Sequence, residues 1–79
     1  MILSEHAKEE MLADGISEEE VRQCIEHGTK IIKDCVNGEM RYGKRLAMKD
    51  WSVIAIYTFR QGETRVITAY TVNDQRWRK

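Results

Sequence analysis

Seventy-nine residues make one small domain, because a chain of this length buries only about 60–65% of its unfolded surface and forms one modest core. Hydrophobic residues make up 42% of the chain and charged residues 33%, which excludes a disordered protein. The net charge is zero, but residues 1–28 carry −6 and residues 29–79 carry +6. We therefore expect a single domain over residues 1–79 whose surface is polarised, and which a homodimer interface or a partner protein would stabilise.

The sequence shows no signal for export or membrane insertion. Its N-terminus lacks the basic region and apolar run of a signal peptide, and no segment approaches the roughly 20 apolar residues needed to span a bilayer. We therefore expect a cytoplasmic protein without a membrane partner, in which Cys24 and Cys35 are reduced thiols.

The acidic part of the chain predicts two helices. Ser4 can cap a first helix over about residues 4–14, and Gly15 is suited to the left-handed position that ends it. Ser17, followed three residues later by a glutamate, forms a capping box that begins a second helix over about residues 17–27. The predicted apolar side of the first helix consists of Ala7, Met11 and Leu12. Because the connection is short, we expect an αα-hairpin.

From residue 30 the hydrophobic period changes from helical to extended. Strands are predicted over about residues 30–36, 39–48, 51–60 and 64–72. Asn37-Gly38 and Gln61-Gly62 are typical of tight hairpin turns. The third of these strands is apolar on both faces, as in the centre of a sheet. The sequence therefore predicts an α+β fold in which the αα-hairpin packs on one face of a mainly antiparallel, four-stranded sheet.

Basic, aromatic and hydroxyl side chains gather on two of these strands. They are Arg41, Tyr42, Lys44 and Arg45 on the second strand, and Thr68 and Tyr70 on the fourth. Alternation also places Val66, Thr68, Tyr70 and Val72 on one face of the last strand. Arginine binds phosphate through paired hydrogen bonds, and tyrosine rings stack on unpaired bases, so such a surface could bind RNA. The alternative interpretation is a set of solvated strand residues whose stems cover the sheet.

Thiol and imidazole groups raise the question of a metal site. Cys24 and His27 are three residues apart on the second predicted helix, Cys35 follows on the first strand, and His6 lies on the first helix. These ligand types suit zinc, but the paired spacing of a zinc finger is absent. We expect no metal and no other cofactor, and a thiol or metal sensor is the alternative that these residues leave open.

Several short motifs together resemble a widespread family of small prokaryotic domains of unknown function. The family pattern opens S-x-H-A-x-x-R-M, continues R-G-I-S and closes on a strand that reads V/I-T-x-Y. The matching residues are Ser4-Glu5-His6-Ala7-Lys8, Met11, Gly15-Ile16-Ser17 and Ile67-Thr68-Ala69-Tyr70. Members have been grouped with the RelE-like and barnase-like ribonuclease toxins, which also place two helices on an antiparallel sheet.

The resemblance implies a metal-independent endoribonuclease that acts as the toxin of a toxin–antitoxin pair. The resemblance implies catalytic roles for His6, Thr68 and Tyr70, which match its motifs, and Arg45 and Arg41 match it only as basic residues of the strand. Together with the strand pattern, we expect His6, Arg45, Thr68 and Tyr70 to be catalytic and Arg41, Tyr42 and Lys44 to bind substrate. In such a reaction a base removes the proton of a 2′-hydroxyl, cations stabilise the phosphorane, and an acid protonates the leaving 5′-oxygen. We therefore expect RNA and a cognate antitoxin protein as partners, and no DNA, which lacks the 2′-hydroxyl.

Two positions depart from the family pattern. Glu10 and Asp14 stand where the family usually has arginine, and their carboxylates should repel RNA from the first helix. The alternative function is therefore a non-catalytic protein-binding or dimerisation module of the same fold that has lost nuclease activity.

Overall fold

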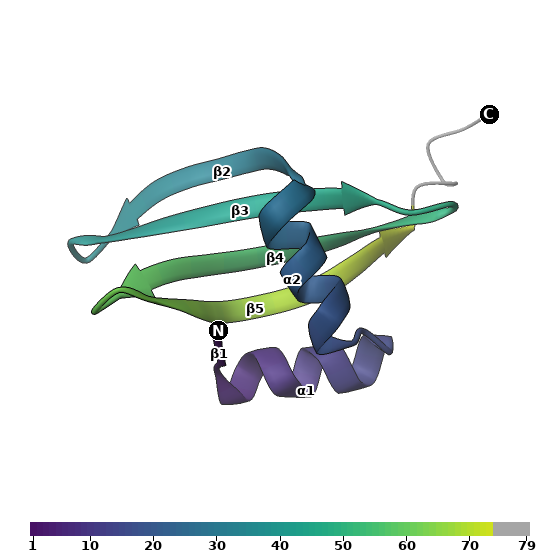
Figure 1. Ribbon diagram of the computed structural model, residues 1–79, viewed down its shortest axis with the longest axis horizontal. Coiled ribbons are helices and arrows are strands. Elements are labelled where there is room, and N and C mark those ends of the chain that lie inside the picture. The colour runs from purple at the N-terminus through teal and green to yellow at the C-terminus, as the bar shows by residue number, and fades with distance from the viewer. Residues whose placement is uncertain (74–79) are drawn as a thin grey trace.

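The computed structural model describes residues 1–73 and contains two helices packed on a five-stranded sheet (Figure 1). In chain order the elements are β1 (Ile2–Leu3), α1 (Glu5–Asp14), α2 (Glu18–His27), β2 (Thr29–Val36), β3 (Glu39–Ala47), β4 (Trp51–Arg60) and β5 (Glu63–Asn73). The strand order is β1-β5-β4-β3-β2; β1 runs parallel to β5, and the other neighbours are antiparallel. The predicted α+β class is confirmed. Strand β1 was not among the four predicted strands, because two residues are too few to show the alternation of a strand.

The helix starts form as their capping residues predict. The Ser4 side chain accepts a hydrogen bond from the backbone N–H of Ala7 at 3.0 Å, and its hydroxyl donates to the carbonyl of Ile67 at 2.8 Å. Ser17 and Glu20 form the complete capping box, with reciprocal hydrogen bonds of 2.8 and 3.1 Å. The cap at Ser4 thus also ties the start of α1 to β5.

The hairpin turns also follow from local residue chemistry. Asn37 and Gly38 have φ values of 53° and 78°, and Gln61 and Gly62 have values of 55° and 76°. Two consecutive residues with positive φ match the right-handed twist of the flanking strands and keep a two-residue hairpin tight. These turns fix the registers of the β2–β3 and β4–β5 hairpins.

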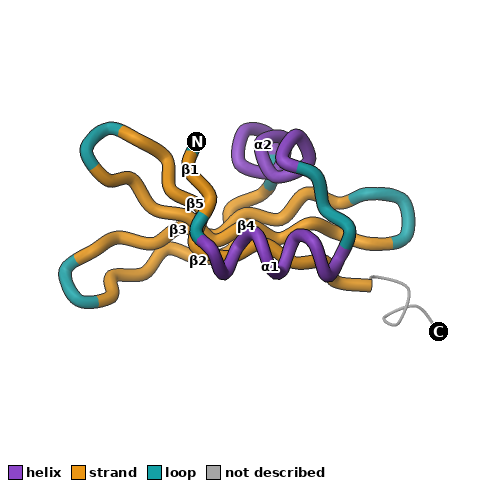
Figure 2. The backbone as a smooth tube through the Cα atoms, turned by 90° about the horizontal axis from the view of Figure 1, so that it is seen from below, coloured by secondary structure: helices purple, strands orange, loops and turns teal. Residues whose placement is uncertain are grey.

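The two helices take different positions on the sheet. Helix α1 lies along β5, whereas α2 crosses β3 and β4 (Figures 1 and 2). The core between helices and sheet is formed by Ala7, Met11, Ile16, Val21, Cys24, Val53, Ala55, Val66 and Ala69. No helix within residues 1–73 has the length and apolar character to cross a membrane.

The predicted apolar side of α1 is wrong at one residue. Ala7 and Met11 are buried, but Leu12 is 86% exposed. Ala7 and Met11 are four residues apart and share one side of the helix, while Leu12 is turned a further 100° around the axis. Because α1 flanks β5 instead of lying between two layers, only that narrow side is covered.

A β-bulge changes the predicted faces of β5. The pairs Ile56–Thr68 and Tyr57–Val66 are consecutive on β4, but they leave Ile67 between them on β5. The extra residue interrupts the alternation of side chains. The prediction that Val66 shares a face with Thr68 is therefore wrong, and Val66 is fully buried in the core under the helices.

The bulge also moves Arg65 to the other face of the sheet. Arg65 pairs with Thr58, which follows Ser52, Ile54 and Ile56 on the side of β4 that points away from α2. A guanidinium group thus joins that face near the turn end of β5, where simple alternation does not place it.

The two hairpins part at their tips. Pairing between β3 and β4 extends from Ala47–Ser52 to Tyr42–Tyr57 and ends there. Beyond this pair the tip of the β2–β3 hairpin and the tip of the β4–β5 hairpin diverge (Figures 1 and 2). The sheet is therefore continuous under α2 and divided at the end that the helices leave open.

Strand β2 forms the outer edge of the sheet opposite β1. Seven of its eight residues are exposed, and its register against β3 shifts between Lys30 and Ile32. This irregular edge carries Lys30 and Lys33 beside the exposed Ile31 and Ile32.

Candidate functional site

The face of the sheet that points away from α2 collects several arginines. We call it the arginine face; its polar residues include Arg41, Arg45, Arg65, Ser52, Thr58, Thr68 and Tyr70, together with the carboxylates of Glu39 and Asp34, of which Asp34 pairs with Arg41. Paired residues on neighbouring strands point to the same face, and so do residues two apart on one strand. By these two rules, each of these side chains lies on the side of the sheet that points away from α2. Of the sequence-predicted site, the structure thus brings together Arg41, Arg45, Thr68 and Tyr70.

One row across the arginine face consists of Arg45, Ile54 and Tyr70. Arg45 pairs with Ile54 on β4, and Ile54 pairs with Tyr70 on β5. Ile54 is only 7% exposed although no helix of residues 1–73 lies on this face, so we infer that its two neighbours cover it. The Nε of Arg45 donates to the hydroxyl of Ser52 at 3.0 Å. Arg45 is therefore held against the sheet and oriented.

A second basic group lies nearer the turns. Glu39 accepts hydrogen bonds from Arg60, and the shorter is 2.5 Å. These hydrogen bonds, together with the charges of Arg60, Arg41 and Arg65, lower the pKa of the Glu39 carboxyl. The Nε atoms of Arg41 and Arg65 are buried and have no hydrogen-bond partner within the described part of the chain. Arg41 Nε also forms an ion pair with Glu39 Oε1 at 4.0 Å. Three cations thus surround one carboxylate.

His6 lies on α1 beside β5. Two hydrogen-bonded contacts hold α1 along this strand: Ser4 binds the carbonyl of Ile67, and the Asp14 carboxylate accepts from the N–H and hydroxyl of Thr71 at 3.0 and 3.2 Å. His6 follows Ser4 by two residues, and its side chain is exposed. Its side chain makes no hydrogen bond or ion pair with another residue of the described segment, so its distance from the arginine face is not fixed by a contact.

Tyr42 and Lys44 lie on the opposite face of β3 from the arginines. The Nζ of Lys44 donates to the carbonyl of Ile25 in α2 at 2.6 Å. The ring of Tyr42 packs against Tyr57 and Phe59, with centroids 5.7 Å apart in each pair. The structure therefore separates these two predicted substrate-binding residues from the other predicted site residues, because neighbours on a strand point to opposite faces.

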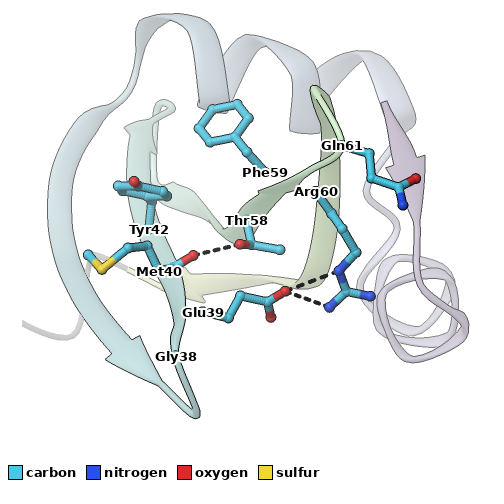
Figure 3. Close-up of a pocket in the computed structure, with 8 residues that line it drawn as sticks. All are labelled: Gly38, Glu39, Met40, Tyr42, Thr58, Phe59, Arg60 and Gln61. Atoms are coloured by element: carbon cyan, nitrogen blue, oxygen red, sulfur yellow. Dashed lines mark hydrogen bonds and ion pairs between the residues drawn. The ribbon is translucent and has the colours of Figure 1, made fainter.

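A pocket of about 430 Å³ lies where the two hairpins part (Figure 3). Its walls are Glu39, Met40 and Tyr42 on β3 and Thr58, Phe59 and Arg60 on β4, with Gly38 and Gln61 at the turns. The hydroxyl of Thr58 donates to the carbonyl of Met40 at 2.6 Å across the gap. The sequence signals the turns but not this pocket, since it depends on where the pairing of β3 and β4 ends.

The cysteines form no metal site with other side chains of residues 1–73. Cys24 is buried, and its thiol donates to the carbonyls of Lys44 and Val53 at 3.2 and 3.4 Å. Burial raises the pKa of this thiol. Cys35 is exposed on β2, and no group of three His, Cys, Asp or Glu side chains in the described segment is arranged to hold a metal ion. Cys24 acts as a small core residue.

Comparison with known protein families matches residues 3–71, from β1 into β5, to the family described as "Domain of unknown function (DUF4258)". The chain belongs to this family. Comparisons with curated proteins and with solved structures gave no match. The resemblance to a family of small domains of unknown function is thus confirmed, whereas a relation to RelE-like or barnase-like toxins is not shown.

The description of DUF4258 assigns no activity. For this DUF4258 domain, the chemical guide to function is the arrangement of side chains on the two sheet faces. The arginine face offers phosphate-binding groups and hydroxyls, and the divided end of the sheet offers the exposed aromatic ring of Phe59.

Proposed function

We propose that the protein binds single-stranded RNA on the arginine face and cleaves it without a metal ion. The observation that supports this most is the shared face of Arg41, Arg45 and Arg65, which carries the Thr68 and Tyr70 hydroxyls as well. Arginine forks match phosphate oxygens, and an open sheet face admits a single strand. The activity would make the domain a RelE-like or barnase-like toxin, controlled by an antitoxin protein.

The proposed reaction uses a base, a cation and an acid. His6 removes the proton of a 2′-hydroxyl, and the oxygen attacks the adjacent phosphorus. Arg45 stabilises the charge of the phosphorane, to which Thr68 donates a hydrogen bond. Tyr70 protonates the 5′-oxygen as its bond to phosphorus breaks, and then regains a proton from His6. The products are a 2′,3′-cyclic phosphate and a 5′-hydroxyl.

The placement of α1 supports the role of His6. Because Ser4 is bound to Ile67 and Asp14 to Thr71, the helix follows the strand that carries Thr68 and Tyr70. The exposed imidazole is free to turn toward a bound strand at this rim, and it is not buried in the core.

The test is cleavage of single-stranded RNA by the purified protein, free of any partner, in the presence of EDTA. We expect products that end in a 2′,3′-cyclic phosphate, and a loss of rate of about 100-fold or more in His6→Ala. His27→Ala, at an exposed histidine on α2, is the matched control and should cleave normally. The catalytic proposal is wrong if the wild-type protein cleaves no RNA, or if His6→Ala cleaves the same RNA equally well.

A second candidate is a binding module without catalysis. Two observations favour it: no residue of the described segment orients His6 by a hydrogen bond, and Glu10 lies one turn further along α1. General bases are commonly oriented by a third group. This candidate predicts that expression alone does not arrest growth, and that the protein forms a homodimer or binds a protein encoded by a neighbouring gene.

A further inference from the structure

The divided end of the sheet has the form of a ligand site. Pairing of β3 with β4 stops at Tyr42–Tyr57, and the pocket of about 430 Å³ opens beyond it (Figure 3). This volume lies within the range of small-molecule sites, about 300–1,000 Å³. Neither helix reaches this end of the sheet in Figure 1. The pocket is therefore accessible from solvent without rearrangement of the helices.

One wall of the pocket is aromatic and exposed. Phe59 is 56% exposed, although it follows a run of buried residues on the central strand. Its ring contacts Tyr42 and Tyr57 edge-on, at centroid distances of 5.7 Å. These contacts fix the ring in place and leave much of its surface to solvent. A rigid, exposed ring offers a platform on which a planar ligand can stack.

The other wall is polar and can form hydrogen bonds with the edge of such a ligand. Gln61 supplies an amide at the turn, and Arg60 and Glu39 form a hydrogen-bonded pair at the side of the pocket. Beyond Tyr42–Tyr57, the pairing edges of β3 and β4 face the gap without forming a ladder. Backbone edges present donors and acceptors in alternation, as the edges of nucleobases do.

The pocket is adjacent to cations that suit a phosphate chain. Arg41 and Arg65 act electrostatically on Glu39, which is itself a wall of the pocket. The Nε of Arg41 forms an ion pair with Glu39 Oε1 at 4.0 Å, and neither Nε has a hydrogen-bond partner within residues 1–73.

Phe59 lies with Tyr42 and Tyr57 on the α2 side of the sheet, whereas Arg41 and Arg65 lie on the arginine face. A ligand with an aromatic ring and an attached phosphate would use both features by passing the gap between the hairpin tips. A peptide side chain would use the aromatic wall but not these donors.

We propose that the pocket between the hairpin tips binds one unstacked nucleobase of a single-stranded RNA, which stacks on Phe59 on the α2 side of the sheet, while the strand passes the gap between the tips and its adjoining phosphates lie on Arg41 and Arg65 on the arginine face. This inference rests on the proposed function for its choice of RNA, and it adds a base-binding subsite. The occupied pocket would position a neighbouring phosphodiester further along the arginine face, toward Arg45.

The experiment uses a single-stranded RNA decamer that contains one 2-aminopurine, a base whose fluorescence changes on stacking. We expect Phe59→Ala to lose the fluorescence change and to weaken binding by about 5- to 100-fold, as is usual for loss of one stacked base. Leu12→Ala, at the 86% exposed leucine of α1, is the matched control and should bind normally. Because Phe59 is exposed, unfolding temperatures should confirm that both variants fold.

Titration of the protein with 5′-nucleoside monophosphates, followed through backbone amide signals, tests the pocket without any reaction. If the nucleotides shift the signals of Tyr42, Thr58 and Gln61, the base site is supported. If only aromatic peptides shift these signals, the base site is overturned in favour of a protein partner. Unchanged RNA affinity in Phe59→Ala also overturns it, even if RNA cleavage depends on Arg45. Conversely, Phe59-dependent binding without cleavage refutes the catalytic proposal and leaves the base site intact.

Discussion

The carboxylate of Asp14 accepts hydrogen bonds from both the backbone N–H and the hydroxyl of Thr71, at 3.0 and 3.2 Å. Asp14 thus binds the backbone N–H of Thr71, which lies on the edge of β5 that faces away from β4. Sequence comparison with the family pattern assigned this residue a negative effect on RNA binding. The structure gives it a stabilising role: it joins the end of α1 to the sheet.

We expect Asp14→Ala to reduce the free energy of unfolding by about 0.5–1.5 kcal/mol, the usual net contribution of an exposed hydrogen-bonded contact. Urea unfolding measures the change. Glu9→Ala, at another exposed carboxylate of α1, is the control and should change stability by less than about 0.5 kcal/mol. Equal stability of the two variants would show that the Asp14–Thr71 contact contributes nothing.

Gly28 allows the chain to pass from α2 into β2 close to β3. A Cβ atom at this position would lie 2.4 Å from the carbonyl oxygen of Cys24 and 2.9 Å from that of Arg45. Both are backbone atoms, which cannot rotate away. We expect Gly28→Ala to destabilise the protein by at least about 1–3 kcal/mol.

The comparison for Gly28→Ala is Gly43→Ala. A Cβ at Gly43 would meet side chains, the nearest being the terminal Cδ1 of Ile56 at 2.9 Å. Because that methyl can move, Gly43→Ala should cost less than Gly28→Ala in thermal or urea unfolding. The reverse order would mean that the approach of Gly28 to Arg45 is readily relaxed.

The buried thiol of Cys24 predicts a loss of stability at alkaline pH. Its pKa in the folded protein is raised by burial above the unfolded value of about 8.5, so the folded state favours the protonated thiol. The resulting contribution to stability is complete below the unfolded pKa and is lost as pH rises through the folded pKa. Urea unfolding under reducing conditions from pH 7 to 10 measures this slope.

Two controls accompany this prediction. Cys24→Ala is expected to be less stable at pH 7 because it leaves a small cavity, but to show a flatter alkaline dependence. Cys35→Ala should retain the wild-type slope, since this thiol is exposed. A thiol reagent should titrate one cysteine in the native protein and both after unfolding; rapid reaction of both native thiols would contradict the burial of Cys24.

The arginine face predicts a salt-dependent affinity for RNA. Each phosphate contact on a single strand contributes about −0.7 to the slope of log affinity against log salt concentration. Arg65→Ala should therefore weaken binding of RNAs of different sequence to a similar extent and reduce the slope by about 0.7–1. Lys30→Ala is the control, because Lys30 is exposed and pairs with Lys44 on the face opposite the arginines, outside the pocket. Equal slopes for both variants would place the RNA elsewhere.

Local chemistry made much of the fold predictable. Capping at Ser4 and Ser17 and the turn residues at Asn37-Gly38 and Gln61-Gly62 act over a few residues, and the structure uses all four. Features that depend on register were not predictable from alternation. One extra residue at Ile67 returns Val66 to the core and brings Arg65 to the arginine face.

The candidate site was predictable only in part for the same reason. Arg41, Arg45, Thr68 and Tyr70 share a face, as period-two alternation and antiparallel pairing require. The pocket at Phe59 depends on the point where two hairpins diverge, which is a property of their tertiary packing. The placement of α1 along β5 likewise depends on contacts between segments 57 and 63 residues apart.

The two rims of the sheet have different consequences for assembly. Strand β1 and helix α1 occupy the β5 rim, whereas β2 has no neighbouring strand on its outer side among residues 1–73. A strand from another chain can extend the sheet only where backbone donors and acceptors remain unpaired. Growth of the sheet by strand addition is therefore directed to β2, where the lysines and the register irregularity at residues 30–32 restrict which strand can fit.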